Sequence, residues 1–147
     1  MSLIYAIIAR EQISNGNSAP VHHILVEASE STGNFPQITL DVLQNNVPKN
    51  EAALLRYDNK FRFHTLNENN FTYLCLTEGS YSAYKAQAFL KDVRNEFCAM
   101  FSPEQRENAI SYGFNSSFGD ILFDKMKEYN ESKHDPKIGA IISNAKE

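Results

Sequence analysis

Two side chains of this 147-residue sequence, His64 and Cys75, could together do nucleophilic chemistry. A thiol beside an imidazole base is an arrangement that activates a cysteine for attack. The two residues would lie on neighbouring strands, but the sequence around them reveals no oxyanion-stabilising group. Cys75 sits in the middle of an apolar run, which favours a small core residue. We therefore expect no enzyme activity from this pair.

The other polar clusters also favour structural roles. His22 and His23 could bind a metal, but adjacent strand residues point to opposite faces, so a shared site is disfavoured. Lys85, Lys91 and Arg94 form a small basic set that is most simply a solvated helix face. The sequence has no phosphate-binding glycine motif and no paired-cysteine zinc pattern. We expect no catalytic residue, no metal site and no cofactor.

Composition indicates one globular domain with a sizeable core. Apolar residues make up 42% of the chain and charged residues 22%, and the net charge is −4. The negative balance argues against a nucleic-acid partner. Cys75 and Cys98 both lie in apolar runs, which is typical of core thiols in a reducing compartment. We find neither a signal peptide nor an apolar stretch of about 20 residues that could span a membrane.

Apolar periodicity predicts five strands. Leu3 to Ala9 is a continuous apolar run, typical of a central strand covered on both faces. His22 to Glu30 alternates, with Ile24, Val26 and Ala28 on one face, and would pair antiparallel with the first strand.

Three more strands follow, with loops between them. We expect them at 51–57, 61–66 and 71–77, and the last is apolar almost throughout. Residues 10–21 contain Asn-Gly and Pro, so they are predicted to be a loop, and 67–70 supply a hairpin turn.

Three helices are predicted. The first runs from Phe35 to about Val47 and starts with Pro36 in its first turn. The second spans about Ser82 to Phe101. The third spans about Ser116 to Tyr129, with Asn115 or Ser116 as its N-cap. The apolar stripe of the first helix consists of Phe35, Ile38, Val42, Leu43 and Val47.

The order of these elements resembles the longin domain, the N-terminal regulatory domain of the long R-SNAREs, which are synaptobrevin-like vesicle-associated membrane proteins. The similarity runs from about residue 3 to residue 130. It is carried by 3–10, Gly33-Asn34-Phe35, Phe63-His64, 73–77, Ala88-Phe89-Leu90 and 114–118.

The resemblance implies an α+β, profilin-like fold. A five-stranded antiparallel sheet would carry one helix on one face and two helices on the other. The longin domain would occupy residues 1–130. Residues 131–147, with Ile138, Ile141, Ile142 and Ala145 at heptad-like spacing, would be a linker and the beginning of a SNARE-motif-like segment.

The resemblance also implies a protein-binding groove between the first helix and the third strand. An edge strand beside an apolar helix is suited to capturing a peptide. Leu54 and Arg56 are expected to face the first helix, and Leu55 and Tyr57 the two C-terminal helices. The expected groove residues are Phe35, Ile38, Val42, Leu43, Leu54 and Arg56.

Taken singly, the four residues of the first helix in that set, Phe35, Ile38, Val42 and Leu43, are more simply core residues than ligand contacts. For Leu54 the two readings are evenly balanced, because an edge strand leaves one face less covered. Arg56 departs from the aromatic or smaller residue expected there, and we hypothesise that it pairs with an acidic ligand residue.

The implied function is regulation of vesicle trafficking and membrane fusion. The groove would bind the chain's own SNARE motif and so control SNARE assembly. It would also bind sorting adaptors or cognate SNAREs. The domain would act on the cytoplasmic face of endomembranes, and membrane contact would come only through a C-terminal anchor absent from this chain. The alternative is a longin-like scaffold subunit of an adaptor or tethering complex.

Overall fold

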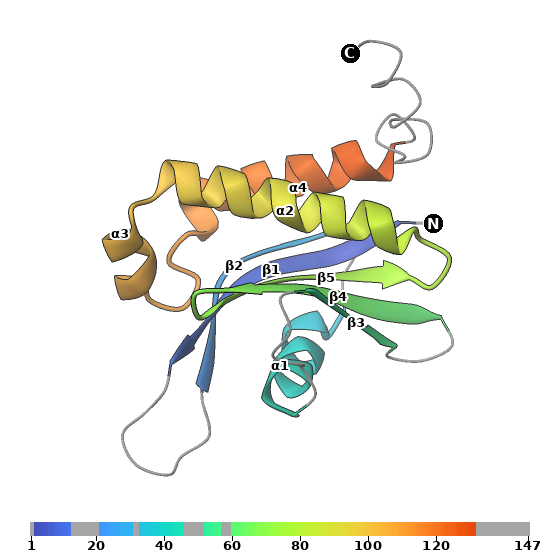
Figure 1. Ribbon diagram of the computed structural model, residues 1–147, viewed down its shortest axis with the longest axis horizontal. Coiled ribbons are helices and arrows are strands. Elements are labelled where there is room, and N and C mark those ends of the chain that lie inside the picture. Colours follow the sequence, from blue (N-terminus) through green and yellow to red (C-terminus); the bar gives the residue numbers. More distant parts are fainter. Residues whose placement is uncertain (1, 13–20, 31–32, 46–51, 57–59, 132–147) are drawn as a thin grey trace.

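The computed structural model describes residues 2–12, 21–30, 33–45, 52–56 and 60–131. They form an α+β unit with an antiparallel sheet between layers of helix (Figure 1). The strands are β1 (Leu3–Gln12), β2 (Val21–Ser29), β3 (Ala52–Arg56), β4 (Phe61–Glu68) and β5 (Phe71–Glu78). The helices are α1 (Phe35–Asn45), α2 (Ala83–Met100), α3 (Pro103–Asn108) and α4 (Asn115–Asn130).

The five-stranded sheet has the order β2-β1-β5-β4-β3, so β2 and β3 are its edges. The most apolar strands, β1 and β5, pair with each other near the middle, as expected of strands buried on both faces. Helix α1 lies under one face, while α2 and α4 cover the other (Figure 1). Over that second face α4 lies on β1 and β2, and α2 lies on β4 and β5.

Alternation along the strands divides the core into two clusters. Residues of β1 such as Tyr5, Ile7 and Ala9 face α1, whereas Ala6 and Ile8 face α2 and α4. Phe97 of α2 is the aromatic centre of the second cluster. Its ring lies 5.1 to 6.4 Å from the rings of Phe71, Tyr73, Phe101, Phe114 and Phe118.

The prediction that Ile24, Val26 and Ala28 share one face is wrong for Ile24. The register of β1 with β2 slips between Ile8 and Ala9, because Val26 pairs with Ile8 and Ile24 with Ala9. Leu25 is therefore the extra residue of a bulge, which reverses the alternation at that point. Ile24 packs on the α1 side, while Leu25 and Val26 both pack on the α2 side.

Two helix starts differ in their capping. Ser82 caps α2 by accepting a hydrogen bond from the backbone N–H of Lys85. The predicted N-cap of α4 is wrong, because Phe114 takes that position without a side-chain hydrogen bond. Helix α3 is absent from the predicted elements, and Ser102 and Gln105 start it with a reciprocal capping box.

Strand β1 extends to Gln12, beyond the predicted end at Ala9. Its polar residues Arg10, Glu11 and Gln12 stay in the sheet because β2 supplies backbone partners for all three. The predicted end of the first helix near Val47 and the segment 132–147 lie outside the described residues.

Candidate functional site

Helix α1 is held against the sheet by an aromatic contact at its start. The rings of Phe35 and Tyr5 lie 5.3 Å apart between centroids. A Cβ at Gly33 would come within 2.8 Å of the Phe35 ring, so only glycine fits there without displacing the ring. The Tyr5 hydroxyl donates to a Glu27 carboxylate oxygen at 2.6 Å. Burial, together with this bond, raises the pKa of Tyr5 and keeps it neutral.

The apolar stripe of α1 splits into buried and partly exposed residues. Val42 and Leu43 are buried against the sheet and are core residues. Phe35 and Ile38 lie at the margin of the same cluster, each partly exposed. Leu40 lies there too, a residue that the sequence analysis missed because it falls outside the stripe of i, i+3 and i+4 positions. Leu40 is two positions from Ile38, about 200° around the helix, so it lies on the opposite flank. We call Phe35 and Ile38 the α1 surface.

Strand β3 does not present Leu54 to α1, so that prediction is wrong. Directly paired residues of antiparallel strands share a face, and Leu54 pairs with His64, which pairs with Cys75. Cys75 belongs to the cluster under α2 and α4. Leu54 therefore lies on the α2 side of the sheet and is 49% exposed. Arg56 pairs with Arg62 in the same register, and its side chain lies outside the described residues.

The two edges of the sheet differ in their cover. The outer edge of β2 is bonded to the segment before α4: Tyr112 and Phe114 donate backbone N–H groups to the carbonyls of Ile24 and Leu25. Beside them, the Asn115 side chain accepts from the backbone N–H of Glu27 at 3.0 Å. Strand β3 is the other edge of the sheet, and no comparable segment covers it in the part of the chain that the structure describes.

The possible reaction pair, His64 and Cys75, belongs to the core. The two residues are directly opposed across β4 and β5, and both are fully buried. The imidazole Nε2 of His64 lies 2.9 Å from the Thr77 hydroxyl. Burial, and then the charge of Arg62, lowers the pKa of His64 to about 4. Burial raises the pKa of Cys75, which keeps the thiol protonated and unreactive.

The remaining polar candidates find separate partners. His22 contacts Gln44 of α1 at 2.9 Å and His23 contacts Gln12 at 3.0 Å, so they diverge as predicted. Lys85 contradicts the prediction of a solvated basic face. It is buried, and its ammonium donates to the Glu131 carbonyl at 3.3 Å.

The two cysteines are free thiols. Cys75 is a core residue as predicted, but Cys98 is only partly buried, with its sulfur 3.3 Å from a guanidinium nitrogen of Arg106.

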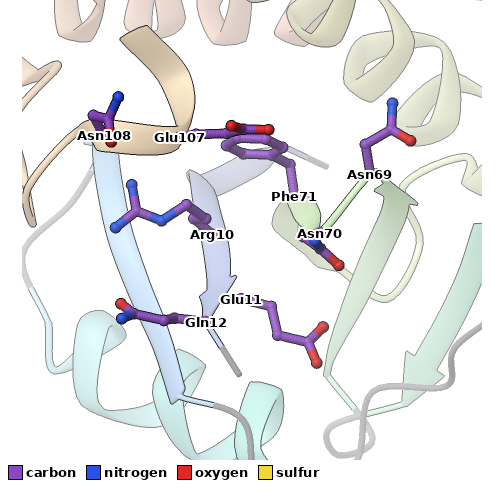
Figure 2. A pocket seen from close by; sticks show the side chains of 8 residues that line it. All are labelled: Arg10, Glu11, Gln12, Asn69, Asn70, Phe71, Glu107 and Asn108. Atoms are coloured by element: carbon purple, nitrogen blue, oxygen red, sulfur yellow. The ribbon is translucent and has the colours of Figure 1, made fainter. Parts of the chain in front are cut away.

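A polar cavity of ≈ 560 Å³ opens at the far end of the sheet, between the end of β1, the β4–β5 turn and α3. Figure 2 shows its side chains spread around the opening instead of meeting at one point. Arg10 is already engaged, because its guanidinium donates to the carbonyls of Arg106 and Ala109. Within the described ranges, no three His, Cys, Asp or Glu side chains gather as a metal site. No described helix is both long and apolar enough to cross a membrane.

Comparison with known proteins identifies the family. Residues 25–122 match the model of the Longin family, described as a regulated-SNARE-like domain. The chain belongs to the longin family. The resemblance seen in the sequence is thereby confirmed, and so is the α+β class with an antiparallel sheet and helices. Longin proteins of this kind are non-enzymatic trafficking proteins, which agrees with the expectation that the chain is not an enzyme.

Proteins similar to this chain occur in distant organisms. The chain is 32% identical to vesicle-associated membrane protein 7B of Dictyostelium discoideum over 132 residues, which cover 90% of this chain and 46% of that protein. It is 25% identical to vesicle-associated membrane protein 7 of Mus musculus, over 94% of this chain and 57% of that protein. Vesicle-associated membrane protein 724 of Arabidopsis thaliana is 29% identical, over 85% of this chain and 52% of that protein. The longin chain thus spans about half the length of the curated relatives it matches.

Proposed function

We propose that this longin domain is the N-terminal regulatory part of an R-SNARE in vesicle trafficking. It acts on the cytoplasmic side of vesicles, controls SNARE assembly by binding its own SNARE motif, and directs sorting by binding adaptors. The observation that carries the proposal is the match of residues 25–122 to the Longin family. The relatives found for the chain are vesicle-associated membrane proteins. The site that supports it best is the α1 surface.

The α1 surface is suited to holding an apolar segment. Its two side chains, Phe35 and Ile38, are partly exposed at the margin of a packed core, so a ligand could cover them without opening the fold. Because Leu54 lies on the other face of the sheet, the proposed site consists of α1 and the sheet residues beneath it. A shared groove would let the SNARE motif and an adaptor compete, and the tighter binder would set the closed or open state.

Calorimetric titration with a peptide from the SNARE motif of the full-length parent tests the proposal. We expect binding, and we expect Ile38→Ser to weaken it about tenfold, because central apolar contacts dominate such interfaces. The matched control is Ile121→Ser, which removes a similarly half-buried isoleucine from α4. Failure of the wild-type domain to bind, or equal loss in both variants, would contradict regulation through the α1 surface.

A further inference from the structure

A carboxylate without a cationic partner lies beside the covered edge of β2. The Glu27 side chain is half-buried on the α1 side of the sheet, where one carboxylate oxygen accepts from the Tyr5 hydroxyl at 2.6 Å. Among the residues that the structure describes, no lysine or arginine forms an ion pair with Glu27. A carboxylate that is partly removed from water is stabilised by a bound cation. Glu27 is therefore suited to a positively charged ligand.

The ring of Tyr112 lies close to this carboxylate. The backbone N–H of Tyr112 donates to the Ile24 carbonyl at 2.7 Å, which places the residue against the edge of β2. Burial, and then the charge of Glu27, raises the pKa of Tyr112. Tyr112 also contributes, after burial and Glu27, to the raised pKa of Tyr5. Such effects fall off with distance, so Tyr112 lies on the same side of the sheet as the Tyr5–Glu27 pair. It is 38% exposed.

Helix α1 adds an apolar side chain next to these two residues. Gln44 contacts His22 of β2 at 2.9 Å, so this side of α1 faces β2. Leu40 lies one turn earlier on the same side of the helix and is partly exposed. We call Glu27, Leu40 and Tyr112 the β2 flank. It lies on the opposite side of α1 from Ile38 and is therefore separate from the α1 surface.

The elements that surround the β2 flank are acidic. Residues 21–30, 33–45 and 109–122 contain no lysine and no arginine. The carboxylates of these ranges belong to Glu27, Glu30, Asp41 and Asp120. Arg10 of β1 faces the other side of the sheet, because its neighbour Ala9 faces α1, and its guanidinium donates to two backbone carbonyls there. The described part of this region thus presents negative charge to a partner.

We propose that the β2 flank binds a basic segment of a partner protein by holding one arginine side chain. The guanidinium pairs with the Glu27 carboxylate and lies against the Tyr112 ring, while an apolar neighbour of the arginine covers Leu40. Arginine fits better than lysine, because its planar guanidinium can stack on a ring and pair with a carboxylate at once. This inference does not depend on SNARE-motif or adaptor binding at the α1 surface.

The test is an NMR titration of the ¹⁵N-labelled chain with a synthetic peptide, acetyl-Gly-Leu-Arg-Leu-Gly-amide. The comparison peptide carries citrulline in place of arginine, which keeps the shape of the side chain and removes its charge. We expect the arginine peptide to bind and to shift the amide signals of Glu27, Leu40 and Tyr112. The citrulline peptide should bind at least about tenfold more weakly.

Four variants separate this site from general negative charge. Glu27→Gln should weaken the arginine peptide about fivefold, because the charge is lost while the amide oxygen can still accept from Tyr5. Tyr112→Ala should weaken it about threefold, whereas Tyr112→Phe keeps the ring and should bind as the wild type does. The matched control is Glu104→Gln, which removes the same charge from exposed α3 and should leave the affinity unchanged.

Several results would overturn the inference. They are no binding of the arginine peptide, equal binding of the citrulline peptide, equal weakening by Glu104→Gln, or shifts confined to Phe35 and Ile38. Self-association of the free chain that Glu27→Gln abolishes would also overturn it, since a second copy would then occupy the flank. Ile38→Ser should leave the affinity for the arginine peptide unchanged, so this inference and the proposed function can fail independently.

Discussion

His64 is a buried imidazole whose protonation the folded state opposes. It is fully buried between strands, with one ring nitrogen beside Thr77 and the other, Nδ1, without a hydrogen-bond partner. A proton on this ring would have to be accommodated without water and close to the charge of Arg62. The neutral imidazole is therefore the form that the folded state accepts.

We predict that acid destabilises the domain through His64. The pKa is about 4 in the folded state and 6.5 when unperturbed, so between these values the unfolded chain binds a proton that the folded chain excludes. The contribution is fully present above pH 6.5 and is lost as the pH falls toward 4, at up to about 1.4 kcal/mol per pH unit. Urea unfolding of wild type and His64→Gln across this range measures the difference in slope.

The control for that experiment is Leu74→Met, a volume-conserving change at a buried position of β5 that adds no titratable group. It should keep the wild-type slope. A His64→Gln variant with an unchanged slope would show that other groups cause the acid sensitivity.

At the scale of elements, the edge of β2 depends on residues far away in the chain. Three of its backbone groups are bonded by residues 112–115, and Tyr112 adopts a positive φ of 59° in doing so. A left-handed conformation is costly for a tyrosine, so the contact with β2 must hold it in place. This segment closes the β2 edge of the sheet.

We predict that Asn115→Ala loosens the β2 edge more than it loosens α4. The side-chain oxygen Oδ1 of Asn115 accepts a hydrogen bond from the backbone N–H of Glu27. Its removal should lower the free energy of unfolding by about 1 kcal/mol and speed hydrogen exchange at the Glu27 amide. The neighbouring Ser116→Ala is the control, because Ser116 is exposed and is not the N-cap. Faster exchange in the first turn of α4, with Glu27 unchanged, would instead restore Asn115 as a cap.

At the scale of the whole molecule, Asn130 joins the end of α4 to the start of the sheet. Its side chain accepts from the backbone N–H of Leu3 at 2.6 Å and donates to the Leu3 carbonyl at 3.1 Å. Nearby, the Tyr81 hydroxyl donates to the Tyr129 carbonyl at 2.8 Å. These contacts hold the last described turn of the chain beside the first strand.

We predict that Asn130→Ala lowers the free energy of unfolding by about 2 kcal/mol, because it leaves both polar backbone groups of buried Leu3 without their partner. Thermal and urea unfolding measure this loss. Asn108→Ala, which removes one exposed bond within α3, should cost less than about 0.5 kcal/mol. Similar losses in the two variants would argue that Asn130 does not hold the ends together.

The sequence by itself determined the elements and the class. The apolar runs of β1 and β5 predicted buried strands, and the stripes of α1, α2 and α4 predicted helices near their observed bounds. The sequence also predicted the family, because short motifs and the order of the elements can be recognised from neighbouring residues alone.

Only the tertiary structure decided which face each residue occupies. Alternation does not say which helix lies over which side, and only the pairing of Leu54 with His64 shows that Leu54 lies on the α2 side of the sheet. The bulge at Leu25 reverses the alternation of β2, and that depends on the register with β1. Lys85 is buried because the end of α4 returns to it. Each of these facts depends on contacts between residues distant in sequence, and that is the physical reason local patterns could not supply them.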